Sequence, residues 1–336
     1  MPTIKNISIS FPENFVNNFE IDKMRPKWNI KRASSRTGVE KRGICKKNET
    51  VLDLSIKAAN KIFEENIISA EAIDGIIFCT QSADYIMPNN ASLIHGKFNF
   101  SEKTMAFDIN LACSGFPYSI GIASNLIKSE SANDILLFCG DTYSKLMSPG
   151  DRSTNLLFGD GVACIYISKE NGGLKLIDSE YYTSGVNYER FILENGGARN
   201  PIRKHFEYED DFNQVTSDDP NFINMDGVGI LSFFNSRVPK SIISILKKNN
   251  LNIDDIKYFI PHQASKIAVE SIRKRLKIDD SKFYFNIKET GNLTSASIPL
   301  ALSQLLNENK IVKGDNIICC GFGVGLSWAT SLLRYE

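Results

Sequence analysis

The sequence lacks any excess of charge: its 336 residues include 39 Lys and Arg and 39 Asp and Glu. A chain without net charge has no overall field that draws it to nucleic acid or to an anionic membrane, so we expect neither partner. Residues 1–6 (MPTIKN) also lack the apolar core of a secretion signal. Together these absences predict a cytoplasmic protein.

The sequence also lacks cysteines at functional spacings. Its seven cysteines are an odd number, with no C-x-x-C pair and no spacing typical of metal ligands. Without an export signal, this pattern predicts reduced thiols rather than a disulfide framework. We therefore expect no metal site and no cofactor.

Long apolar runs are scarce. Residues 316–333 carry no charge and approach the length of a membrane-spanning helix. Gly321, Gly323 and Gly325 interrupt this run, which favours two buried strands joined by a glycine turn.

The composition that remains, 42% hydrophobic and 23% charged, is typical of a soluble globular protein. Short apolar runs alternate with helical patterns, which predicts an α/β fold whose parallel sheet is covered on both faces. The expected strands are 3–10, 75–80, 105–109, 135–139, 162–167, 257–262, 283–285, 316–321 and 326–334. The expected helices are 51–64, one from about 91, 116–127, 228–248, 263–276 and one ending near 306.

The two ends of this pattern repeat each other. Residues 158–167 and residues 321–333 each contain a glycine-bearing turn followed by an apolar strand, as a duplicated unit would. We expect an N-terminal half at 1–180, an irregular insertion or pocket wall at 181–222, and a C-terminal half at 223–336.

Cys113 lies where the predicted strand 105–109 gives way to the helix that begins near Phe116. A thiol at a helix N-terminus faces unpaired N–H groups and the positive end of the dipole, so it should ionise more easily than a free thiol. The segment therefore suggests a nucleophile. A buried core cysteine is the alternative reading.

Two further candidate site residues lie in the C-terminal half. His262 ends an apolar strand, where open α/β sheets place their ligands, and Asn292 lies in a Gly-Asn-Leu-Thr-Ser loop. Taken singly, His262 could be a hydrogen-bonded structural residue and Asn292 a turn residue.

A basic run extends over residues 23–47, with Glu40 as its one acidic residue. Such a run is usually a solvated face, but it could also attract a phosphorylated ligand, with Arg36 as the best candidate. Trp28 could stack on an adenine ring or serve as a hydrophobic anchor.

Four motifs occur in an order that resembles the β-ketoacyl-acyl-carrier-protein synthase III family of thiolase-fold condensing enzymes. They are Asn-Leu-Ala-Cys-Ser-Gly-Phe (110–116), Pro-His-Gln-Ala (261–264), Gly-Asn-Leu-Thr-Ser-Ala-Ser-Ile-Pro (291–299) and Gly-Phe-Gly-Val-Gly-Leu-Ser-Trp (321–328). The resemblance covers nearly the whole chain. It implies a thiolase-like fold, in which two duplicated βαβαβ-type halves form αβαβα layers.

The resemblance also implies the reaction. An acyl group is loaded on Cys113 and joined to a malonyl-type thioester with loss of CO₂, which gives a 3-oxoacyl thioester. His262 and Asn292 are expected to bind the thioester carbonyl of the extender and so stabilise the enolate. The oxyanion loop is expected at Gly323, Val324 and Gly325. Acyl-coenzyme A and acyl-carrier-protein thioesters are the expected substrates.

The family's remaining positions can be carried over as well. Coenzyme A and substrate binding fall to Arg36, Arg152, Trp28, Phe158 and Met87, of which Met87 reaches the acyl pocket of a partner subunit and so implies a homodimer. Docking of the acidic carrier protein is expected at Lys266, Arg273 and Lys274.

Three residues depart from the family pattern: Arg32 replaces a Trp, Ser265 an Asn and Val324 a Gly. They surround the substrate pockets, so we expect altered primer choice and a specialised fatty-acid, secondary-metabolite or surface-glycan pathway. The alternatives are an acyltransferase to an amine or hydroxyl without decarboxylation, a non-catalytic dimer partner, and an unrelated cysteine hydrolase.

Overall fold

The computed structural model describes residues 2–201 and 219–336. Within them one sheet of nine strands forms the frame. Its strands are β1 (Thr3–Ser10), β4 (Gly75–Cys79), β5 (Met105–Ile109), β6 (Asp134–Asp141), β7 (Gly161–Ser168), β8 (Leu174–Thr183), β11 (Ile256–Pro261), β12 (Asn316–Gly323) and β13 (Ser327–Tyr335). The larger helices are α3 (Val51–Glu64), α4 (Asn90–Phe98), α5 (Gly115–Lys128), α7 (Gly227–Lys248), α8 (Lys266–Leu276) and α9 (Ser297–Asn307).

The strand order is β11-β12-β13-β8-β1-β7-β6-β4-β5. Strands β1, β7, β6, β4 and β5 belong to the N-terminal half, and the other four to the C-terminal half. The halves join where β1 meets β8, through the pairs Thr3↔Lys175 and Ile4↔Leu174. The two halves therefore share one continuous sheet.

The order of elements repeats between the halves. In each half a helix (α3 or α7) precedes a strand (β4 or β11), a second helix (α4 or α8) follows, and a third helix (α5 or α9) leads into an antiparallel strand pair (β6–β7 or β12–β13). The duplicated architecture predicted from the sequence is thus confirmed.

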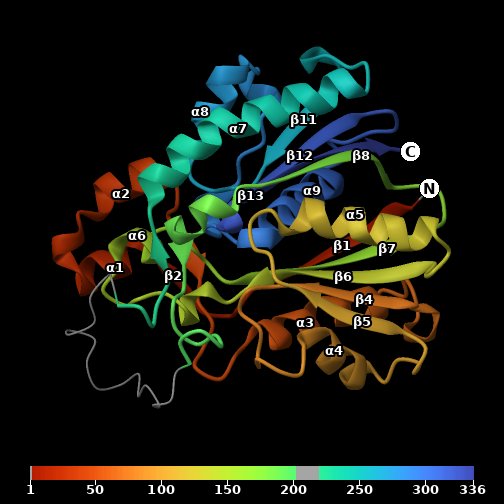
Figure 1. Ribbon diagram of the computed structural model, residues 1–336, viewed down its shortest axis with the longest axis horizontal. Helices are drawn as coiled ribbons and strands as arrows, with labels where there is room; N and C mark the ends of the chain where they lie inside the picture. The colour runs from red at the N-terminus through yellow and green to blue at the C-terminus, as the bar shows by residue number, and fades with distance from the viewer. Residues whose placement is uncertain (1, 202–218) are drawn as a thin grey trace.

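Helices α5 and α9 occupy the middle of the molecule (Figure 1). Helix α5 contacts β4 and β6 of one half and β8, β12 and β13 of the other, while α9 contacts β1, β7 and β11. The outer layers are α3 with α4 and α7 with α8, each over its own apolar cluster. These contacts give the expected αβαβα layers.

Strand β4 shows why these residues build a middle layer. All five of its residues are buried. Ile77 and Cys79 face the central cluster, whereas Ile76 and Phe78 face the outer cluster under α3. A continuous apolar run is what a strand covered on both faces requires.

Helix α3 illustrates how an outer layer is specified. Its buried residues Val51, Leu54, Ala58 and Ile62 recur at the spacing of one helical face. Thr50 and Asp53 form a capping box at its start. The observed bounds coincide with the prediction for residues 51–64.

Some expected elements differ. Residues 283–285 form only an isolated bridge, Phe259↔Phe283, rather than a strand. Helix α8 begins at Lys266 and not at residue 263, because Ser265 caps it through Ala268 N–H (3.3 Å). Ile267 in the first turn of this helix is 37% exposed.

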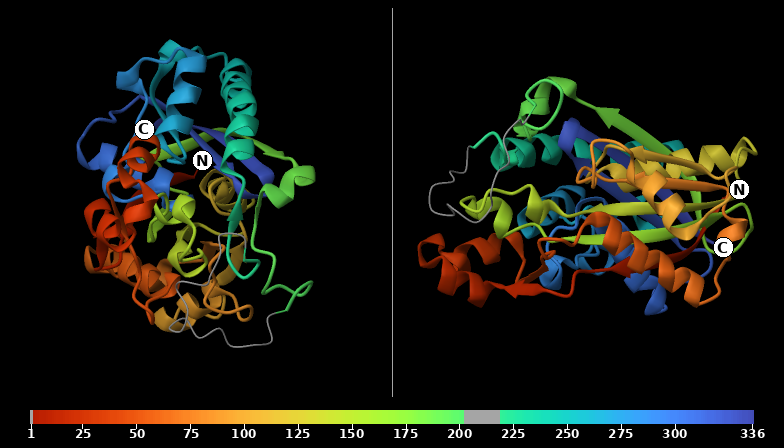
Figure 2. Two further views of the ribbon diagram at one scale, coloured as in Figure 1. Left: turned by 90° about the vertical axis from the view of Figure 1, so that its left-hand side faces the viewer. Right: turned by 90° about the horizontal axis from the view of Figure 1, so that it is seen from below.

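Short elements that the sequence did not reveal lie in and before the basic run. They are β2 (Phe15–Asn17), α1 (Asn18–Met24), α2 (Ile30–Thr37) and β3 (Lys41–Gly43), followed later by α6 (Arg152–Asn155). In Figure 1 and in the right-hand view of Figure 2, α1 and α2 lie at the side of the molecule away from the chain ends.

The expected insertion at 181–222 lies partly outside the described residues. Strand β8 crosses residue 180, because residues up to Thr183 pair with β13 through Ser327↔Thr183. Two short strands follow, β9 (Phe191–Ile192) and β10 (Asn224–Met225), and they pair with each other. Among the described helices, none is both long enough and apolar enough to cross a bilayer.

Candidate active site

Cys113 lies between the end of β5 and the start of α5, as its sequence context predicted. The chain turns there through a backbone bond from Gly115 N–H to the Ala112 carbonyl (2.7 Å). Cys113 is 4% exposed, yet it lines a cavity of about 690 Å³. Its burial does not remove it from a ligand's reach.

The glycine-containing end of β12 lies against Cys113. A methyl group at Gly323 would stand 2.6 Å from Cys113 Cβ and 3.0 Å from Sγ, and one at Gly321 would stand 2.6 Å from the Cys113 carbonyl oxygen. Glycine is required here because the two backbones approach so closely. The loop predicted to hold an oxyanion is therefore next to the thiol.

His262 extends from β11 through a bond from its N–H to the Cys320 carbonyl (2.7 Å). The imidazole is 1% exposed and lines the same cavity as Cys113. Its Nδ1 lies 2.8 Å from Ser297 Oγ, and that hydroxyl donates to the Thr294 carbonyl (2.9 Å). With the hydroxyl proton engaged there, Nδ1–H donates to Ser297 and Nε2 keeps a lone pair.

Asn292 completes the set that lines the cavity. Its backbone is fixed on Phe158, because Asn292 N–H donates to the Leu157 carbonyl (2.9 Å) and Gly159 N–H donates to the Asn292 carbonyl (3.1 Å). Its side-chain Oδ1 accepts from Thr294 N–H (2.9 Å), and its Nδ2 makes one long contact with the Ala264 carbonyl (3.4 Å). The amide can thus donate to a ligand.

Burial dominates the electrostatics of the site. It raises the pKa of the Cys113 thiol; the Asp141 carboxylate raises that pKa further, and the backbone N–H of Cys113 opposes it. The prediction of an acidic thiol is therefore wrong for the resting site. Burial also lowers the pKa of His262 to about 3, against a backbone hydrogen bond with Thr294. Thiol and imidazole are both neutral near pH 7.

Asp141, at the end of β6, is 1% exposed beneath this site. Its Oδ1 accepts from Thr80, from Gln81 N–H and from Ser82. Its Oδ2 accepts from the Thr294 hydroxyl (2.5 Å). Burial raises the pKa of Asp141 to about 6, although these hydrogen bonds lower it.

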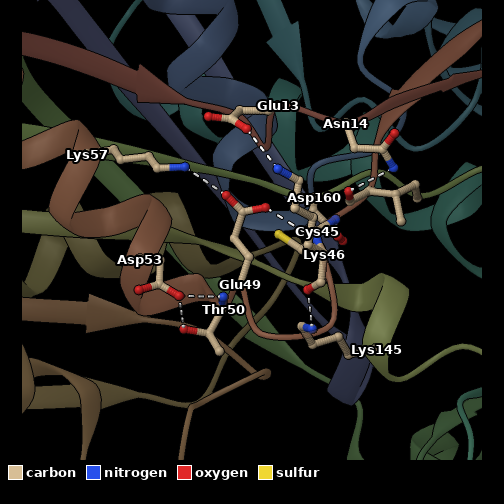
Figure 3. A network of polar contacts seen from close by, with 11 residues as sticks. Glu13, Asn14, Cys45, Lys46, Glu49, Thr50, Asp53, Lys57, Lys145 and Asp160 are labelled. Carbon is tan, nitrogen blue, oxygen red and sulfur yellow. Dashed lines mark hydrogen bonds and ion pairs between the residues drawn. The ribbon is translucent and has the colours of Figure 1, made fainter. Parts of the chain in front are cut away.

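A second buried carboxylate, Asp160, has a different set of partners. It accepts from Cys45 N–H (2.8 Å) and Ser144 N–H (3.0 Å), within the N-terminal half. Figure 3 shows it beside Cys45, in the loop whose ion pairs are Lys46–Glu13 and Lys57–Glu49. Asp160 therefore stabilises a loop. Asp141 instead contacts Thr294, two residues after Asn292.

The mouth of the cavity is cationic. Arg32 and Arg36 of α2 and Arg152 of α6 line it, and no carboxylate among the described residues pairs with any of the three. Apolar side chains line the interior: Phe158, Phe191, Met225, Ile230, Phe234 and Phe322. The cavity thus joins a positively charged entrance to an apolar interior that ends at Cys113.

Other predicted residues lie away from the cavity. Trp28 packs with Ile21, Ile30 and Leu156, and its carbonyl accepts from Arg152 (3.3 Å). The prediction that Trp28 could stack on an adenine therefore has no support in its position; the hydrophobic-anchor reading fits. Met87 is 80% exposed in the loop after β4, and it does not line the cavity.

The basic residues expected on α8 differ from one another. Lys266 and Lys274 are exposed. Arg273 is paired with Glu270 (2.9 Å) and Asp280 (3.4 Å), so its charge is neutralised locally. Of the three, Lys266 and Lys274 are available to a partner. The described residues contain no group of three or more His, Cys, Asp or Glu side chains that could hold a metal ion.

Sequence reasoning missed the second set of polar residues. Thr294, Ser297 and Asp141 were not singled out, because Ser, Thr and Asp are common in turns and carry no distinctive spacing. The one available signal was their closeness in sequence to Asn292 and to the end of a buried strand.

Comparisons with known proteins agree with this geometry. Family models of 3-oxoacyl-[acyl-carrier-protein] synthase III and of its C-terminal part match residues 107–185 and 246–335. The β-ketoacyl-[acyl-carrier-protein] synthase III of Clostridium tetani is 39% identical over 304 residues, covering 90% of this chain and 89% of its own length. That of Clostridioides difficile is 32% identical over 335 residues, with 99% and 98% coverage.

Solved structures extend the agreement to the fold. A 3-oxoacyl-(acyl-carrier-protein) synthase III superposes with a TM-score of 0.92 at 30% identity, covering 99% of both chains. A 3-oxoacyl-(acyl-carrier protein) synthase from Burkholderia xenovorans gives 0.89 at 28% identity, covering 100% of this chain and 94% of its own. The layers and the site thus define a thiolase-fold condensing enzyme. The chain belongs to the β-ketoacyl-[acyl-carrier-protein] synthase III family.

Proposed function

We propose that this enzyme loads a primer acyl group on Cys113 and condenses it with a malonyl-type thioester, releasing CO₂ and a 3-oxoacyl thioester. The observation that carries the proposal is that Cys113, His262, Asn292 and Gly323 line one cavity. The family names of the relatives, which are 3-oxoacyl synthases, support the same reaction.

In the first half-reaction Cys113 attacks the primer thioester. The thiol must lose its proton, and its raised pKa means that it needs a base. The lone pair on Nε2 of neutral His262 takes this proton and passes it to the departing thiol. The acyl group is then held on Cys113 as a thioester.

In the second half-reaction the malonyl-type thioester enters, and its carbonyl oxygen accepts from Asn292 Nδ2. A proton taken up from solvent at His262 Nε2 supplies the second hydrogen bond, favoured by the negative charge of the ligand. Loss of CO₂ leaves an enolate on that oxygen, which these two donors stabilise.

The enolate carbon attacks the acyl carbon on Cys113. Backbone N–H groups of Cys113 and of the loop at 323–325 hold the resulting oxyanion. Collapse breaks the carbon–sulfur bond, and His262 gives its proton to the Cys113 thiolate. One proton is consumed for each CO₂ released, and ping-pong kinetics follow.

Delivery of the substrates follows from the charges at the mouth. We infer that Arg36 and Arg152 hold the phosphates of coenzyme A, with Arg32 as a third cation where the family has Trp. Phe158 and the other apolar residues line the way to Cys113. Lys266 and Lys274 suit the docking of an acidic acyl carrier protein.

We also propose a homodimer in the cytoplasm. Tyr85, Ile86 and Met87 form an exposed apolar stretch, 59%, 87% and 80% exposed, of the kind that a second subunit covers. Size-exclusion chromatography with light scattering tests this; a monomer at micromolar concentration contradicts it.

The remaining point of substrate specificity is the acyl group that serves as primer. Arg32, Ser265 and Val324 lie around the cavity where the family has other residues, and this favours a primer other than acetyl-coenzyme A. Weak activity with acetyl-coenzyme A beside strong activity with another primer is the expected result. If acetyl-coenzyme A is the best primer, this proposal fails.

The experiment for the whole reaction is intact-protein mass spectrometry with a panel of acyl thioesters, followed by a malonyl thioester. We expect a mass gain at Cys113 and then release of CO₂ with a 3-oxoacyl product. An acyl group passed to an amine or hydroxyl without CO₂ release would indicate the acyltransferase alternative, and no adduct from any donor would indicate a non-catalytic dimer partner.

A further inference from the structure

Thr294 has an unusual backbone for its residue type. Its φ is +50°, in the left-handed region. The other described non-glycine residues with positive φ are asparagines, a glutamate and a lysine, so Thr294 is the β-branched member of that group. A β-branched residue is strained there, and such strain persists only where surrounding contacts over-determine it.

All the polar groups of Thr294 are engaged. Its N–H donates to Asn292 Oδ1 (2.9 Å), and its carbonyl accepts from Ser297 Oγ (2.9 Å). Its hydroxyl donates to the Asp141 carboxylate. Thr294 is 1% exposed and does not line the cavity, so these contacts are structural and not to a ligand.

Two of these contacts reach the donors of the site. The bond to Asn292 Oδ1 fixes the amide so that Nδ2 is left to donate. The bond from Ser297 fixes the hydroxyl that lies 2.8 Å from His262 Nδ1. One residue therefore orients both groups that act on the extender carbonyl.

The third contact crosses between the halves. Asp141 belongs to the N-terminal half and is held there by Thr80, Gln81 N–H and Ser82. Through Thr294 it ties the loop of the C-terminal half to the end of β6, close to the Cys113 thiol.

We propose that Thr294, anchored by Asp141, is the positioning residue that aligns His262 and Asn292 with Cys113. The inference rests on the proposed function. It assigns to Thr294 and Asp141 a role in placing the donors, without contact to substrate.

The test compares Thr294→Val, which removes the hydroxyl and keeps the shape, with Thr294→Ser, which keeps the hydroxyl. Acyl loading of Cys113 is followed by mass spectrometry, and CO₂ release from a malonyl thioester is measured separately. Thr294→Val is expected to lower CO₂ release by about tenfold to a hundredfold, since sub-ångström misplacement is costly. Loading should fall less, because Asn292 takes part only in the second half-reaction. Thr294→Ser should restore CO₂ release.

Thr330→Val is the matched control. Thr330 is equally buried, and its hydroxyl bonds to Ser241 and Cys320 within the sheet and its covering helix. It should leave both half-reactions unchanged. Ser297→Ala should lower both half-reactions together, because of the two donors, His262 and Asn292, the Ser297 hydroxyl contacts only His262; this variant keeps the inference testable if Thr294→Val does not fold.

The inference is overturned if Thr294→Val leaves CO₂ release intact, lowers both half-reactions equally, or behaves like Thr330→Val. A wild-type protein that loads an acyl group but releases no CO₂ overturns the proposed function, and this inference with it. A wild type that releases CO₂ beside an unaffected Thr294→Val overturns the inference alone.

Discussion

Helices α5 and α9 begin in the same way in the two halves of the molecule, yet they carry different chemistry. Helix α5 starts at Gly115 and α9 at Ser297, each without a side-chain cap, and each has proline at its third position. Cys113 therefore corresponds to Ser295. Cys113 faces the cavity, whereas Ser295 is buried and its Oγ has no hydrogen-bond partner among the described residues.

The difference shows how two halves of similar architecture come to supply different side chains to one site. Both halves place a strand end and a helix start at the same edge of the sheet. The N-terminal half places the proposed nucleophile Cys113 at the helix start, and the C-terminal half places His262 at the strand end and Asn292 in the loop. The start of α5 lies against the turn that precedes α9: a methyl group at Gly115 would stand 3.3 Å from Ser295 Cβ.

Replacing Cys113 by Ala removes the feature that distinguishes the N-terminal half. We expect the acyl adduct to disappear and condensation to fall to background, because no other thiol lines the cavity. Intact-protein mass spectrometry measures the adduct. Cys45→Ala is the control, since Cys45 (8% exposed) is the most exposed of the other cysteines; an adduct that survives Cys113→Ala contradicts the assignment.

Asn292→Ala is expected to impair the second half-reaction and to leave the first intact. Loss of one donor to a developing oxyanion lowers the rate by about a hundredfold to a thousandfold, so CO₂ release should fall by this amount while Cys113 still loads. Separate assays of acyl loading and of CO₂ release measure the loss in each half-reaction. Equal losses in both would show that the halves do not divide the chemistry.

Gly323→Ala tests the contact between the halves directly. The new methyl group would meet Cys113 Cβ at 2.6 Å and Sγ at 3.0 Å, so loop and thiol must separate, and we expect loading to fall by about tenfold to a hundredfold. Gly96→Ala on α4 is the control, because nothing lies within 4 Å of its methyl group. It should keep full activity and gain about 0.4–1 kcal/mol in stability. Unchanged loading in Gly323→Ala would argue against a tight oxyanion loop.

The smallest effect concerns the carboxylate that links the halves. The pKa of Asp141 is raised to about 6 in the fold, above its unfolded value of about 3.9. The folded state therefore holds more protons between these values, and this group's contribution to stability falls as pH rises through that window, by about 3 kcal/mol.

Asp141→Asn lacks this titration, so its stability relative to wild type should increase from pH 4 to pH 7.5. Urea unfolding at both pH values measures the difference, in which the titration of His262 cancels because both proteins contain it. A stability difference that does not change with pH would mean that burial does not raise the pKa of Asp141.

Sequence patterns located most of the frame and the three side chains, Cys113, His262 and Asn292, that line the cavity together. Strands such as β1 and β5 and helix α3 fall where apolar periodicity placed them, because their burial is encoded locally. Residues 283–285 did not become a strand, since pairing depends on distant neighbours. The thiol's pKa was predicted in the wrong direction, because the helix end is a local feature while desolvation depends on the whole fold. Thr294 and Asp141 meet only after both halves have packed.

The pairing of β1 with β8 also determines where a tag or tether can be attached to the protein. Thr3 and Tyr335 pair with Lys175 and Leu174, so both chain ends flank β8. They lie on the side of the molecule opposite α1 and α2, and α2 borders the cavity mouth (Figures 1 and 2). An affinity tag or surface tether at either end therefore leaves the entrance open, so immobilised enzyme should keep its access to bulky carrier-bound substrates.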